Sequence, residues 1–591
     1  MVKMMNNEIN TGSIQEISTN TDIREQILNT YFKPNVLKDA QHDIIRMSKI
    51  ANEIEDLLVK RVKGKEEPTE KELTEKISSY SRTSKEIYDK NINSGWPFDV
   101  LYMYIIDGIQ RFDDYKLDIE KVAETAREIY EKTNQKSLVV ANFFDILFSL
   151  SQVQMAREET EKLDATIEEG KKLIEVTANV PLSTVINWII EYLLEYEYSE
   201  NDKNKDNETP VINFNNDAKL IAQWIIKLLS IESFNRSQYE LLKRSLEKFK
   251  SSPRAIYTIL KIYRCVEDIK YQLAVKDLSN WEFGHYTRGS VLQILLKQEN
   301  NVKEQYKIEG KSRLYNVRYM NDPEEGKILD RLLGIENSNN PGDKVESSPW
   351  FLMSLTTAMD ELTMWSQYGE NAEGVCLVLQ NDSFSEVASI NDVESFTQRR
   401  NNLKSFETAR NHDEKRLPLL ASKEYLYRIC YLDEEALKRD EIEIVELHND
   451  LLKDKKNVKD ENRVINKVKK SLVQIKEIID IELLNDKEKD GELLYNTNKL
   501  LEEIRYLFKS SGYCYEKEIR LLKYSELNPN NTEIKVQNMS PFAKLYIERD
   551  TPIQIKKIIF GPKFKEPENV TPLVHLLDKD IICKRSSKKF K

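Results

Sequence analysis

Apolar residues recur at helical spacing through the first half of the chain, from about residue 20 to 275, and this period predicts a series of amphipathic helices. Trp96, Phe98, Leu101, Tyr102 and Ile105 illustrate the pattern, because they fall on one face of a helix. Further apolar segments of helical length follow at about 117–133, 138–155, 159–176, 181–198, 217–231, 236–250 and 254–274. We therefore expect the first half of the chain to be all α.

The helical segments also recur at a longer period. Alternate segments begin at Pro97, Ser137 and Val180, which are 40 and 43 residues apart. Such a period, with two helices per unit, is typical of helical-hairpin arrays of the tetratricopeptide or a related kind. The consensus residues of that repeat are not cleanly present, so the pattern predicts an architecture rather than a named repeat. We expect a flexible N-terminus over 1–20 and a tetratricopeptide-like α-helical repeat domain over 21–276.

After Asp277 the chain contains short runs rich in Val, Ile, Leu and Tyr that are bounded by turn residues. Such runs predict β-strands, here at 374–380, 425–432, 518–524, 544–548 and 555–561. The segment 433–510 instead consists almost entirely of Lys, Glu, Asp, Leu and Ile at a helical period. We expect a multidomain protein whose C-terminal part, 277–591, is an α+β domain with a helical insertion at 433–510. The simplest interpretation of the insertion is a solvated helical hairpin without chemistry of its own.

Glycine and proline are scarce and unevenly distributed. The 591 residues include 16 Gly and 16 Pro, which is less than half of the ordinary share of about 12%. This scarcity excludes an all-β sandwich or propeller for the whole chain, and it excludes collagen-like or Pro/Gly-rich disorder. Five glycines lie in residues 1–280 and eleven in the remaining 311, so two different architectures are expected.

Charge and cysteine usage limit the classes of partner and compartment. Lys+Arg 89 against Asp+Glu 100 gives a formal net charge of −11, which argues against broad electrostatic capture of nucleic acid. The five cysteines are widely spaced and form no CxxC pair, so neither a disulfide framework nor a zinc ribbon is indicated. No secretory signal is visible, and the best apolar stretch, Leu138–Leu150, contains Asn142 and Asp145 and is too short to span a bilayer. We expect a cytoplasmic protein without a membrane partner.

No strong catalytic signature is present: the chain lacks GxxxxGK[ST], HExxH and a Gly-rich dinucleotide fingerprint, and no metal site is evident. Candidate chemistry lies instead in four clusters of polar and aromatic residues, Phe283–Arg288, Arg318–Gly326, Phe351–Gly369 and Tyr513–Arg520. Each has an ordinary structural interpretation. A His-Tyr pair usually packs, Asn-Asp-Pro usually forms a rigid turn, and Met-Trp usually belongs to a core.

The last cluster carries the most charge. On a strand, Glu516, Glu518 and Arg520 share one face, because the side-chain period is two. Two carboxylates and a guanidinium are costly to bury unless they are paired. The alternative is a solvated strand face, and the sequence leaves both open.

Taken in order, these clusters resemble the motifs of the domain-of-unknown-function family 2971 over roughly 280–565. The ordered set is specific, although each motif alone is weak. The matching residues are His285-Tyr286-Thr287, Tyr319-Met320-Asn321-Asp322-Pro323-Glu324-Glu325, Ser354-Leu355, Met364-Trp365-Ser366-Gln367-Tyr368, Gly374-Val375-Cys376-Leu377, Glu516-Lys517-Glu518-Ile519-Arg520 and Ile558-Ile559-Phe560-Gly561-Pro562.

The layout is also similar, more loosely, to that of ADP-ribosyltransferases, in which NAD is the substrate. The resemblance implies that His285 anchors the adenosine-side ribose, Glu518 is the catalytic carboxylate and Glu516 aids the acceptor. A tyrosine, from among Tyr286, Tyr319 and Tyr368, would stack on nicotinamide, and Arg288 or Arg520 would contact the pyrophosphate. The full set expected to bind the nucleotide is His285, Tyr286, Thr287, Arg288, Tyr319, Asn321, Asp322, Ser354, Trp365, Tyr368 and Arg520.

Three functions remain open from the sequence. The first is an NAD-consuming transferase or glycohydrolase whose helical domain binds a protein or peptide partner or an activating signal, an arrangement common in bacterial toxins and phage-defence proteins. The second is a metal-dependent hydrolase or nuclease that uses Asp322, Glu325, Glu516 and Glu518 around a hard cation. The third is a non-enzymatic module that recognises a nucleotide or a protein.

Overall fold

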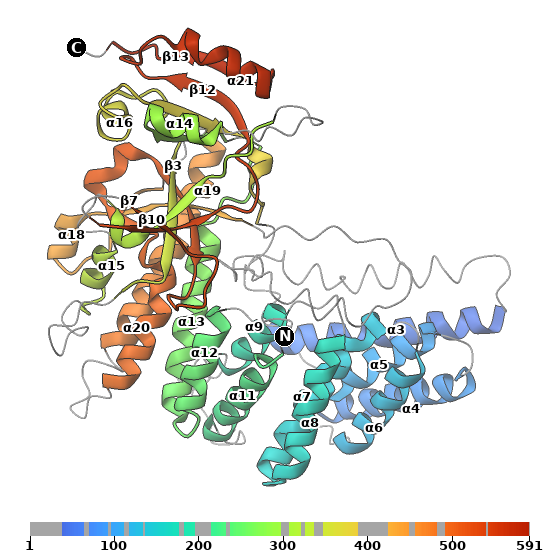
Figure 1. Ribbon diagram of the computed structural model, residues 1–591. Coiled ribbons are helices and arrows are strands. Elements are labelled where there is room, and N and C mark those ends of the chain that lie inside the picture. Colours follow the sequence, from blue (N-terminus) through green and yellow to red (C-terminus); the bar gives the residue numbers. More distant parts are fainter. Residues whose placement is uncertain are drawn as a thin grey trace. The chain divides into compact units, whose positions relative to one another are not determined.

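A computed structural model describes most of the chain (Figure 1). The described residues are 38–63, 70–92, 96–110, 118–133, 136–176, 182–194, 214–231, 237–279, 281–296, 307–320, 326–335, 347–387, 424–447, 455–480, 491–538 and 542–589. They form two compact units, one of residues 1–234 with 246–257 and the other of 235–245 with 258–591. The expected flexible segment 1–20 lies outside the described residues.

The described part of the first unit is helical, as its apolar period predicts. The buried residues Phe98, Leu101, Tyr102 and Ile105 lie on one helix, which confirms the helical face expected from the sequence. The helical N-terminal region is thus confirmed, whereas its repeat character stays a prediction. Its helices are α3 (Lys38–Lys63), α4 (Glu70–Lys90), α5 (Trp96–Gln110), α6 (Ile119–Lys132), α7 (Lys136–Ala156), α8 (Thr160–Val176), α9 (Leu182–Leu194) and α11 (Phe214–Leu228).

Helix α7 is the central apolar helix of this unit. It continues beyond the apolar stretch noted in the sequence, and its segment Val139–Ala156 is long and apolar enough to cross a membrane by length and composition. No other described helix meets that test. Phe144 and Phe148 of α7 pack edge-on against Trp188, and Phe144 also packs against Trp224. These contacts are typical of a core helix, which is apolar on every side because neighbouring helices surround it.

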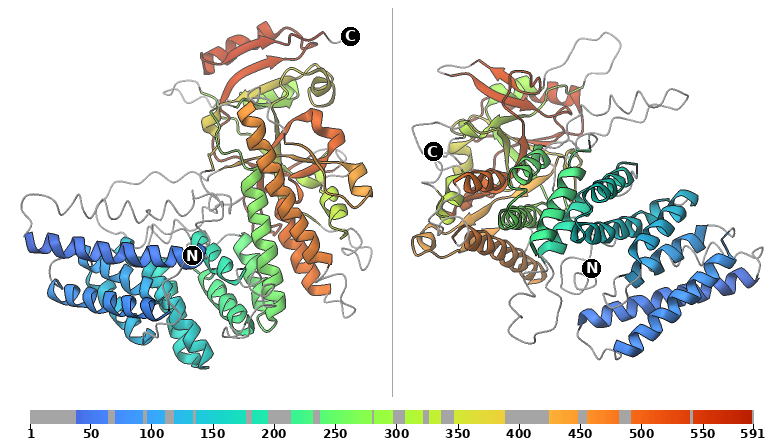
Figure 2. Two further views of the ribbon diagram at one scale, coloured as in Figure 1. Left: turned by 180° about the vertical axis from the view of Figure 1, so that it is seen from behind. Right: turned by 90° about the horizontal axis from the view of Figure 1, so that it is seen from below.

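The second unit begins with helical structure that the sequence assigned to the first. Helix α13 (Pro253–Leu273) belongs to this unit from residue 258 onward, as does the first part of α12 (Ser237–Lys248). Helix α13 lies beside α20 (Gly491–Arg505), as Figure 2 shows. Lys270 joins them, because its buried ammonium donates to Glu267 at 2.8 Å and to Glu503 of α20 at 2.9 Å. A helix of the insertion therefore completes a buried ion triad with α13.

A ten-stranded mixed sheet forms the centre of the second unit. Its main order is β10-β11-β2-β3-β1-β4-β12-β13, while β9 pairs with both β3 and β5. Only β12 and β13 run parallel among its described pairs. The strands are β1 (Phe283–Thr287), β2 (Arg313–Asn316), β3 (Trp350–Thr356), β4 (Val375–Leu379), β5 (Leu426–Arg428), β9 (Glu518–Tyr524), β10 (Lys535–Gln537), β11 (Lys544–Glu548), β12 (Ile555–Phe560) and β13 (Ile582–Arg585). All five strand segments expected from the sequence are present, and the mixed sheet with helices confirms the α+β class.

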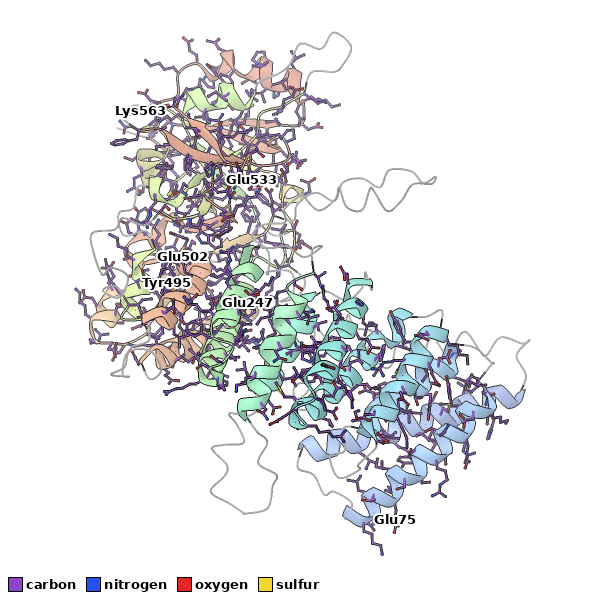
Figure 3. The ribbon with its side chains drawn as sticks, turned by 60° about the horizontal axis from the view of Figure 1, so that its bottom comes forward. Glu75, Glu247, Tyr495, Glu502, Glu533 and Lys563 are labelled. Atoms are coloured by element: carbon purple, nitrogen blue, oxygen red, sulfur yellow. The ribbon has the colours of Figure 1, made fainter. Side chains whose placement is uncertain are left out.

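Loops outside the main strands are tied to the sheet by charged side chains. Glu533, labelled in Figure 3, precedes β10, accepts a hydrogen bond from Ser525 at 2.9 Å and pairs with Lys523 at the end of β9. The short helices α14 (Gly289–Leu295), α15 (Lys327–Leu332), α16 (Leu362–Gln367) and α21 (Thr571–Leu577) also belong to this unit.

The segment 433–510 is more than a solvated helical hairpin. It contains the helices α18 (Glu434–Lys438), α19 (Lys455–Ile478) and α20, together with strands β7 (Ile444–Leu447) and β8 (Phe508–Ser510). Both strands pair with β6 (Cys430–Leu432), giving a second sheet of order β7-β6-β8. Leu493, Leu500, Leu501 and Ile504 of α20 are buried, so the interpretation of this segment as a solvated helical hairpin is wrong.

The two faces of the main sheet bury different sets of side chains. Residues Phe283, Met353, Leu355, Leu377 and Ile519 belong to the larger apolar core on one face. The other face carries the smaller cluster of Tyr286, Ala358, Met364, Trp365, Ala372, Cys376, Val378 and Ile559. Candidate polar residues can therefore be assigned to a face from strand register, because directly opposite residues point to the same side.

Candidate functional site

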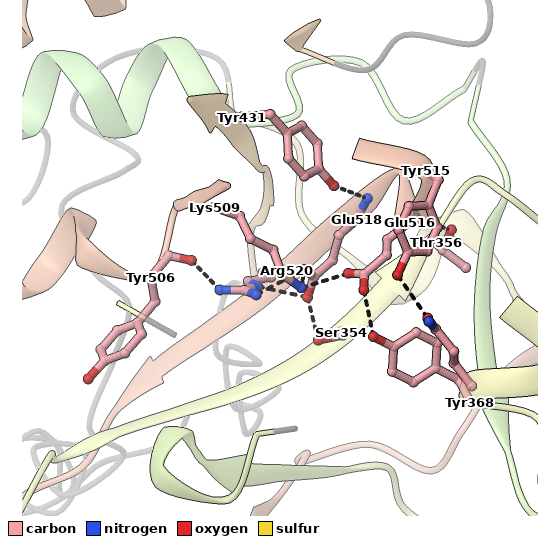
Figure 4. Close-up of polar contacts among 11 residues, drawn as sticks. Ser354, Thr356, Tyr368, Tyr431, Tyr506, Lys509, Tyr515, Glu516, Glu518 and Arg520 are labelled. Carbon is pink, nitrogen blue, oxygen red and sulfur yellow. Dashed lines mark hydrogen bonds and ion pairs between the residues drawn. The ribbon is translucent and has the colours of Figure 1, made fainter. Parts of the chain in front are cut away.

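Glu518 and Arg520 of β9 form a buried ion pair. The guanidinium donates from Nε to Glu518 Oε1 at 2.8 Å and from a terminal nitrogen to Oε2 at 2.9 Å (Figure 4). Ser354 of β3 lies directly opposite Arg520 in the register, and its hydroxyl donates to Glu518 Oε1 at 2.5 Å. The other terminal nitrogen of Arg520 donates to the carbonyl of Tyr506 at 2.6 Å. The bidentate geometry fixes the carboxylate on the strand.

The small sheet brings two further side chains to this pair. Lys509 of β8 lies opposite Tyr431 of β6 in the parallel register. The ammonium of Lys509 contacts Glu518 Oε2 at 3.3 Å, and the hydroxyl of Tyr431 accepts the backbone N–H of Glu518 at 3.0 Å. The pairing of β6 with β8 is thus what places a second cation on Glu518.

Glu516 reaches the same ammonium from a turn rather than from the strand. It ends a 3₁₀ helix (Ser511–Glu516), and Lys517 then adopts a left-handed conformation with φ of 46° before β9 begins. The carboxylate of Glu516 accepts from Lys509 at 2.6 Å and from the hydroxyl of Tyr368 at 2.6 Å. Both carboxylates are therefore bound to one ammonium, although the expected continuous strand over Glu516–Arg520 is interrupted at Lys517.

The four ionic side chains, Lys509, Glu516, Glu518 and Arg520, are here called the ionic cluster. Each exposes 7% or less of its side chain, so the alternative of a solvated strand face is wrong. The cluster has formal charges of equal number and opposite sign, as the burial of charge requires. Ser354 and Tyr368, which donate hydrogen bonds to Glu518 and Glu516, are half-buried.

The surroundings shift the pKa values of the Glu516 and Glu518 carboxyl groups in opposite directions. Burial alone would raise the pKa of Glu518, but Arg520 and Lys509 lower that pKa to about 2. Burial raises the pKa of Glu516 above its ordinary value, and the nearby charge of Glu518 adds to this against the opposing effect of Lys509. Burial and the hydrogen bond to Glu516 raise the pKa of Tyr368, so this phenol stays protonated. Carboxyl groups with pKa values pushed apart are typical of acid–base sites.

His285 does not share a face with the ionic cluster. On β1 it lies opposite Leu377 of β4, whereas its neighbour Gly284 lies opposite Thr356, which lies opposite Glu518. The imidazole Nδ1 is 2.9 Å from the carbonyl oxygen of Ser354. The imidazole of His285 can reach this carbonyl of β3 because β1 and β2 pair with different parts of the same edge of β3. Burial lowers the pKa of His285, so the ring is neutral near pH 7.

Two of the expected aromatic residues belong to the core. The rings of Tyr286 and Trp365 pack edge-on with centroids 4.8 Å apart. The Tyr286 hydroxyl donates to the carbonyl of Ala358 at 3.0 Å and accepts from the N–H of Glu361 at 3.2 Å, while the Trp365 indole donates to Asp360 at 2.9 Å. With their polar atoms engaged in this way, both rings act as packing residues.

Among the described residues, Thr287, Arg288 and Tyr319 form no hydrogen bond or ion pair with the ionic cluster. Arg288 is exposed and precedes α14, and Thr287 ends β1. Tyr319 lies in a short 3₁₀ turn with the ammonium of Lys544 5.8 Å from its ring centroid. Asn321 and Asp322 lie outside the described residues, as does Glu325.

Sequence reasoning missed Lys509 and Tyr431, which complete the site. Lys509 ends a segment so rich in lysine and glutamate that no single lysine stands out. Tyr431 lies within a predicted strand, where a tyrosine is ordinary. The available signal was electrostatic: a buried pair of glutamates with one arginine requires one more cation.

Among the residues whose placement is described, no group of three or more His, Cys, Asp or Glu side chains could hold a metal ion. The carboxylates of Glu516 and Glu518 instead face Lys509 and Arg520.

The cluster lies largely within a segment that has a known sequence family. Residues 364–521 match a family model. Its description is "Protein of unknown function (DUF2971)". The match to DUF2971 includes Tyr368, Tyr431, Lys509, Glu516 and Glu518, and it is shorter than the expected span of about 280–565. No curated protein and no solved structure matches the chain.

Proposed function

We propose that the second unit cleaves the N-glycosidic bond of a nicotinamide nucleotide such as NAD, as a glycohydrolase or an ADP-ribosyltransferase. The observation that supports this most is the pair Glu516 and Glu518, two buried carboxyl groups bound to one ammonium and shifted to opposite sides of the ordinary pKa. Paired carboxyl groups with divergent pKa values are the usual equipment for cleaving glycosidic bonds.

The chemistry assigns the two groups different tasks. When the bond between nicotinamide and ribose breaks, nicotinamide departs with the electron pair as a neutral molecule and leaves an oxocarbenium-like cation on the ribose. No acid is needed for that departure, whereas a negative charge stabilises the cation. Glu518, with its pKa of about 2, supplies a permanent negative charge. Water or an acceptor hydroxyl then forms the new bond to ribose and gives its proton to a base.

Glu516 is the group suited to take that proton. A carboxylate with a raised pKa is a stronger base than an ordinary one, and the base gains most when its pKa approaches the working pH. The Tyr368 hydroxyl at 2.6 Å and the Lys509 ammonium at 2.6 Å hold its orientation. Because Tyr368 and Ser354 are half-buried and the charged groups are buried, a substrate would approach from their side.

The proposal differs from the expected arrangement at His285. An anchor for the substrate ribose should lie on the face of the catalytic carboxylate, but strand register places His285 on the opposite face from Glu518. We therefore assign the reaction to Glu516, Glu518, Ser354 and Tyr368 and leave His285 outside it. The resemblance to ADP-ribosyltransferases then extends to the proposed chemistry and not to the role of His285.

For the helical first unit we propose recognition of a protein or peptide partner that controls the second unit. Helical arrays offer extended surfaces for such contacts. A role in bacterial toxicity or phage defence, in the cytoplasm, remains an analogy with other proteins that join helical repeats to an effector domain.

A second candidate is a non-enzymatic binding module. It is favoured by one specific observation: both oxygens of Glu518 and both oxygens of Glu516 already accept hydrogen bonds from side chains of the chain. A fully satisfied polar network of this kind rigidifies a fold even without a reaction. In that case the cluster is purely structural.

Turnover of labelled NAD by the full-length chain separates the two candidates. The proposal predicts release of nicotinamide, with the ribose label either free or transferred to protein. Tyr368→Phe should slow this by about 10-fold or more, because the base loses an orienting hydrogen bond. Tyr495→Phe, at an exposed tyrosine on α20, is the matched control and should retain the wild-type rate. Absence of turnover, or equal rates in both variants, would support the binding module instead.

A further inference from the structure

Four cationic side chains gather on the second unit away from the ionic cluster. They are Lys276, which follows α13, Arg428 at the end of β5, and Arg463 and Lys467 on α19. Arg463 and Lys467 are four residues apart, so they occupy the same face of the helix. The contact at 3.6 Å between Cys265 of α13 and Gln474 of α19 places the two helices side by side.

Arg428 has a donor that no described residue uses. One of its terminal nitrogens donates to the carbonyl of Gln272 at 2.8 Å, near the end of α13. Its Nε is buried and donates to no acceptor in the described part of the chain. A buried donor without an acceptor is unfavourable, and a guanidinium prefers planar oxyanions as acceptors. The Arg428 side chain therefore has a buried donor available to bind an anion.

Lys276 experiences the same excess of positive charge. Its ammonium lies 3.7 Å from the ring centroid of Tyr271, which confines it beside α13. Burial lowers its pKa, and the charges of Arg428, Lys467 and Arg463 lower that pKa further, to about 8. The cations therefore repel one another, and an anion among them would relieve that repulsion.

Among the described residues, Glu461 and Asp277 are two acidic groups that lie beside these cations. Glu461, two residues before Arg463 on α19, acts on Arg428 and raises the pKa of its guanidinium against the larger effect of burial. Asp277, next to Lys276, is exposed and accepts hydrogen bonds from the N–H and the hydroxyl of Ser279. Apart from burial, every group that shifts the pKa of Lys276 is a cation, so positive charge dominates around its ammonium.

We propose that Lys276, Arg428, Arg463 and Lys467 form a binding site for a small phosphate-bearing anion with the chemistry of a diphosphate group. A small anion fits better than a nucleic acid, because the chain carries a net charge of −11 and the unused donor of Arg428 is buried. The site is separate from the ionic cluster: Arg428 lies opposite Ile519, whereas Tyr427 lies opposite Arg520, so the two sites use opposite faces of the sheet.

Calorimetric titration of the full-length chain with inorganic pyrophosphate tests this site. Wild type should bind, with affinity that falls as salt is added. Lys276→Met and Lys467→Met should each weaken binding at least 10-fold. Lys469→Met, at an exposed lysine two residues along α19 and so on another face, is the matched control and should bind as wild type does.

Two further measurements complete the test. Without pyrophosphate, the melting temperature of Lys276→Met should equal or exceed that of wild type, because a repelled and partly buried charge has been removed. Lack of pyrophosphate binding by wild type, or equal binding by Lys276→Met, Lys467→Met and Lys469→Met, would overturn the proposal. Binding of a single-stranded oligonucleotide without binding of pyrophosphate would also overturn it, and would indicate a nucleic-acid surface.

Discussion

The side chains of Glu516 and Glu518 have different surroundings although only Lys517 separates them. Glu518 accepts two hydrogen bonds from Arg520 and one from Ser354, and it also contacts Lys509, so its negative charge is well stabilised. Glu516 forms an ion pair with Lys509, which also contacts Glu518, and it accepts a hydrogen bond from the neutral hydroxyl of Tyr368. The left-handed Lys517 is the local cause, because it turns Glu516 out of the strand and toward α16.

This difference predicts unequal effects of removing each charge. Glu518→Gln should destabilise the second unit by roughly 3–5 kcal/mol, because Arg520 and Lys509 stay buried with too little negative charge. Glu516→Gln should lower the free energy of unfolding by less, roughly 1–3 kcal/mol. The amide oxygen can still accept the hydrogen bond from Tyr368, and Lys509 still forms its ion pair with Glu518. Urea unfolding of both variants measures the two costs.

Glu526→Gln serves as a control for the amide substitution itself, since this exposed side chain lies shortly after the end of β9. It should unfold at the same urea concentration as wild type within about 0.5 kcal/mol. Equal stability losses for Glu516→Gln and Glu518→Gln would contradict the unequal roles assigned to the two carboxylates.

At the scale of elements, the backbone between α16 and β4 is tightly packed against its neighbours. Glu370, Asn371 and Ala372 all have positive φ, at 52°, 52° and 74°. The N–H of Gly374 then donates to the carbonyl of Gly369 at 2.8 Å, and its own carbonyl accepts from Gly561 at 2.9 Å. This turn joins α16, which carries Tyr368 at its end, to the strands of the sheet.

A methyl group at Gly374 should therefore be poorly tolerated. An added Cβ would lie 2.3 Å from the carbonyl oxygen of Thr287, which belongs to a backbone that cannot move aside. Gly374→Ala should lower the free energy of unfolding by about 1–3 kcal/mol. Gly491→Ala, at the start of α20, is the control, because nothing lies within 4 Å of its added Cβ. Thermal unfolding compares the two, and equal melting temperatures would contradict the close packing.

Local patterns predicted elements well and long-range partners poorly. The strand Glu518–Tyr524 and the helices up to α13 follow from period and composition, because those signals are contained within each segment. The pairing of β6 with β8 joins residues far apart in the sequence. No local sequence pattern therefore predicts the contact between Lys509 and Glu518. The separation of His285 from Glu518 depends likewise on the register of three strands. Sequence therefore predicted the carboxylates and the serine of the candidate site, but neither its second cation nor its geometry.

At the scale of the whole molecule, the change in glycine content near residue 280 does not coincide with the boundary between the units. Helix α13 looks like the last member of the helical series, yet from residue 258 it belongs to the second unit. Lys270 explains this, because it forms the buried triad with Glu267 and with Glu503 of α20. The N–H of Val275 also donates to the carbonyl of Leu426 in β5 at 2.8 Å.

Fragments of the chain test this boundary. A fragment 235–591 should unfold cooperatively in urea, because it keeps α13 and the triad. A fragment 277–591 should show no cooperative transition, since it lacks the buried ammonium of Lys270 that pairs with the buried carboxylate of Glu503. Cooperative unfolding of both fragments would show that α13 is dispensable for the second unit.

The central claim is that Glu516 acts as the base in cleavage of a nicotinamide nucleotide. The most direct test is the rate of nicotinamide release from NAD, as kcat/KM against pH, for wild type and Glu516→Gln. A base works only when deprotonated, so the wild-type rate should fall as the pH decreases through the pKa of Glu516, which lies above the ordinary 4.5. Glu516→Gln, checked for folding by its melting temperature, should be about 100-fold slower or more and should lack that acid limb. A folded Glu516→Gln protein that releases nicotinamide at the wild-type rate and with the wild-type pH profile would contradict the account.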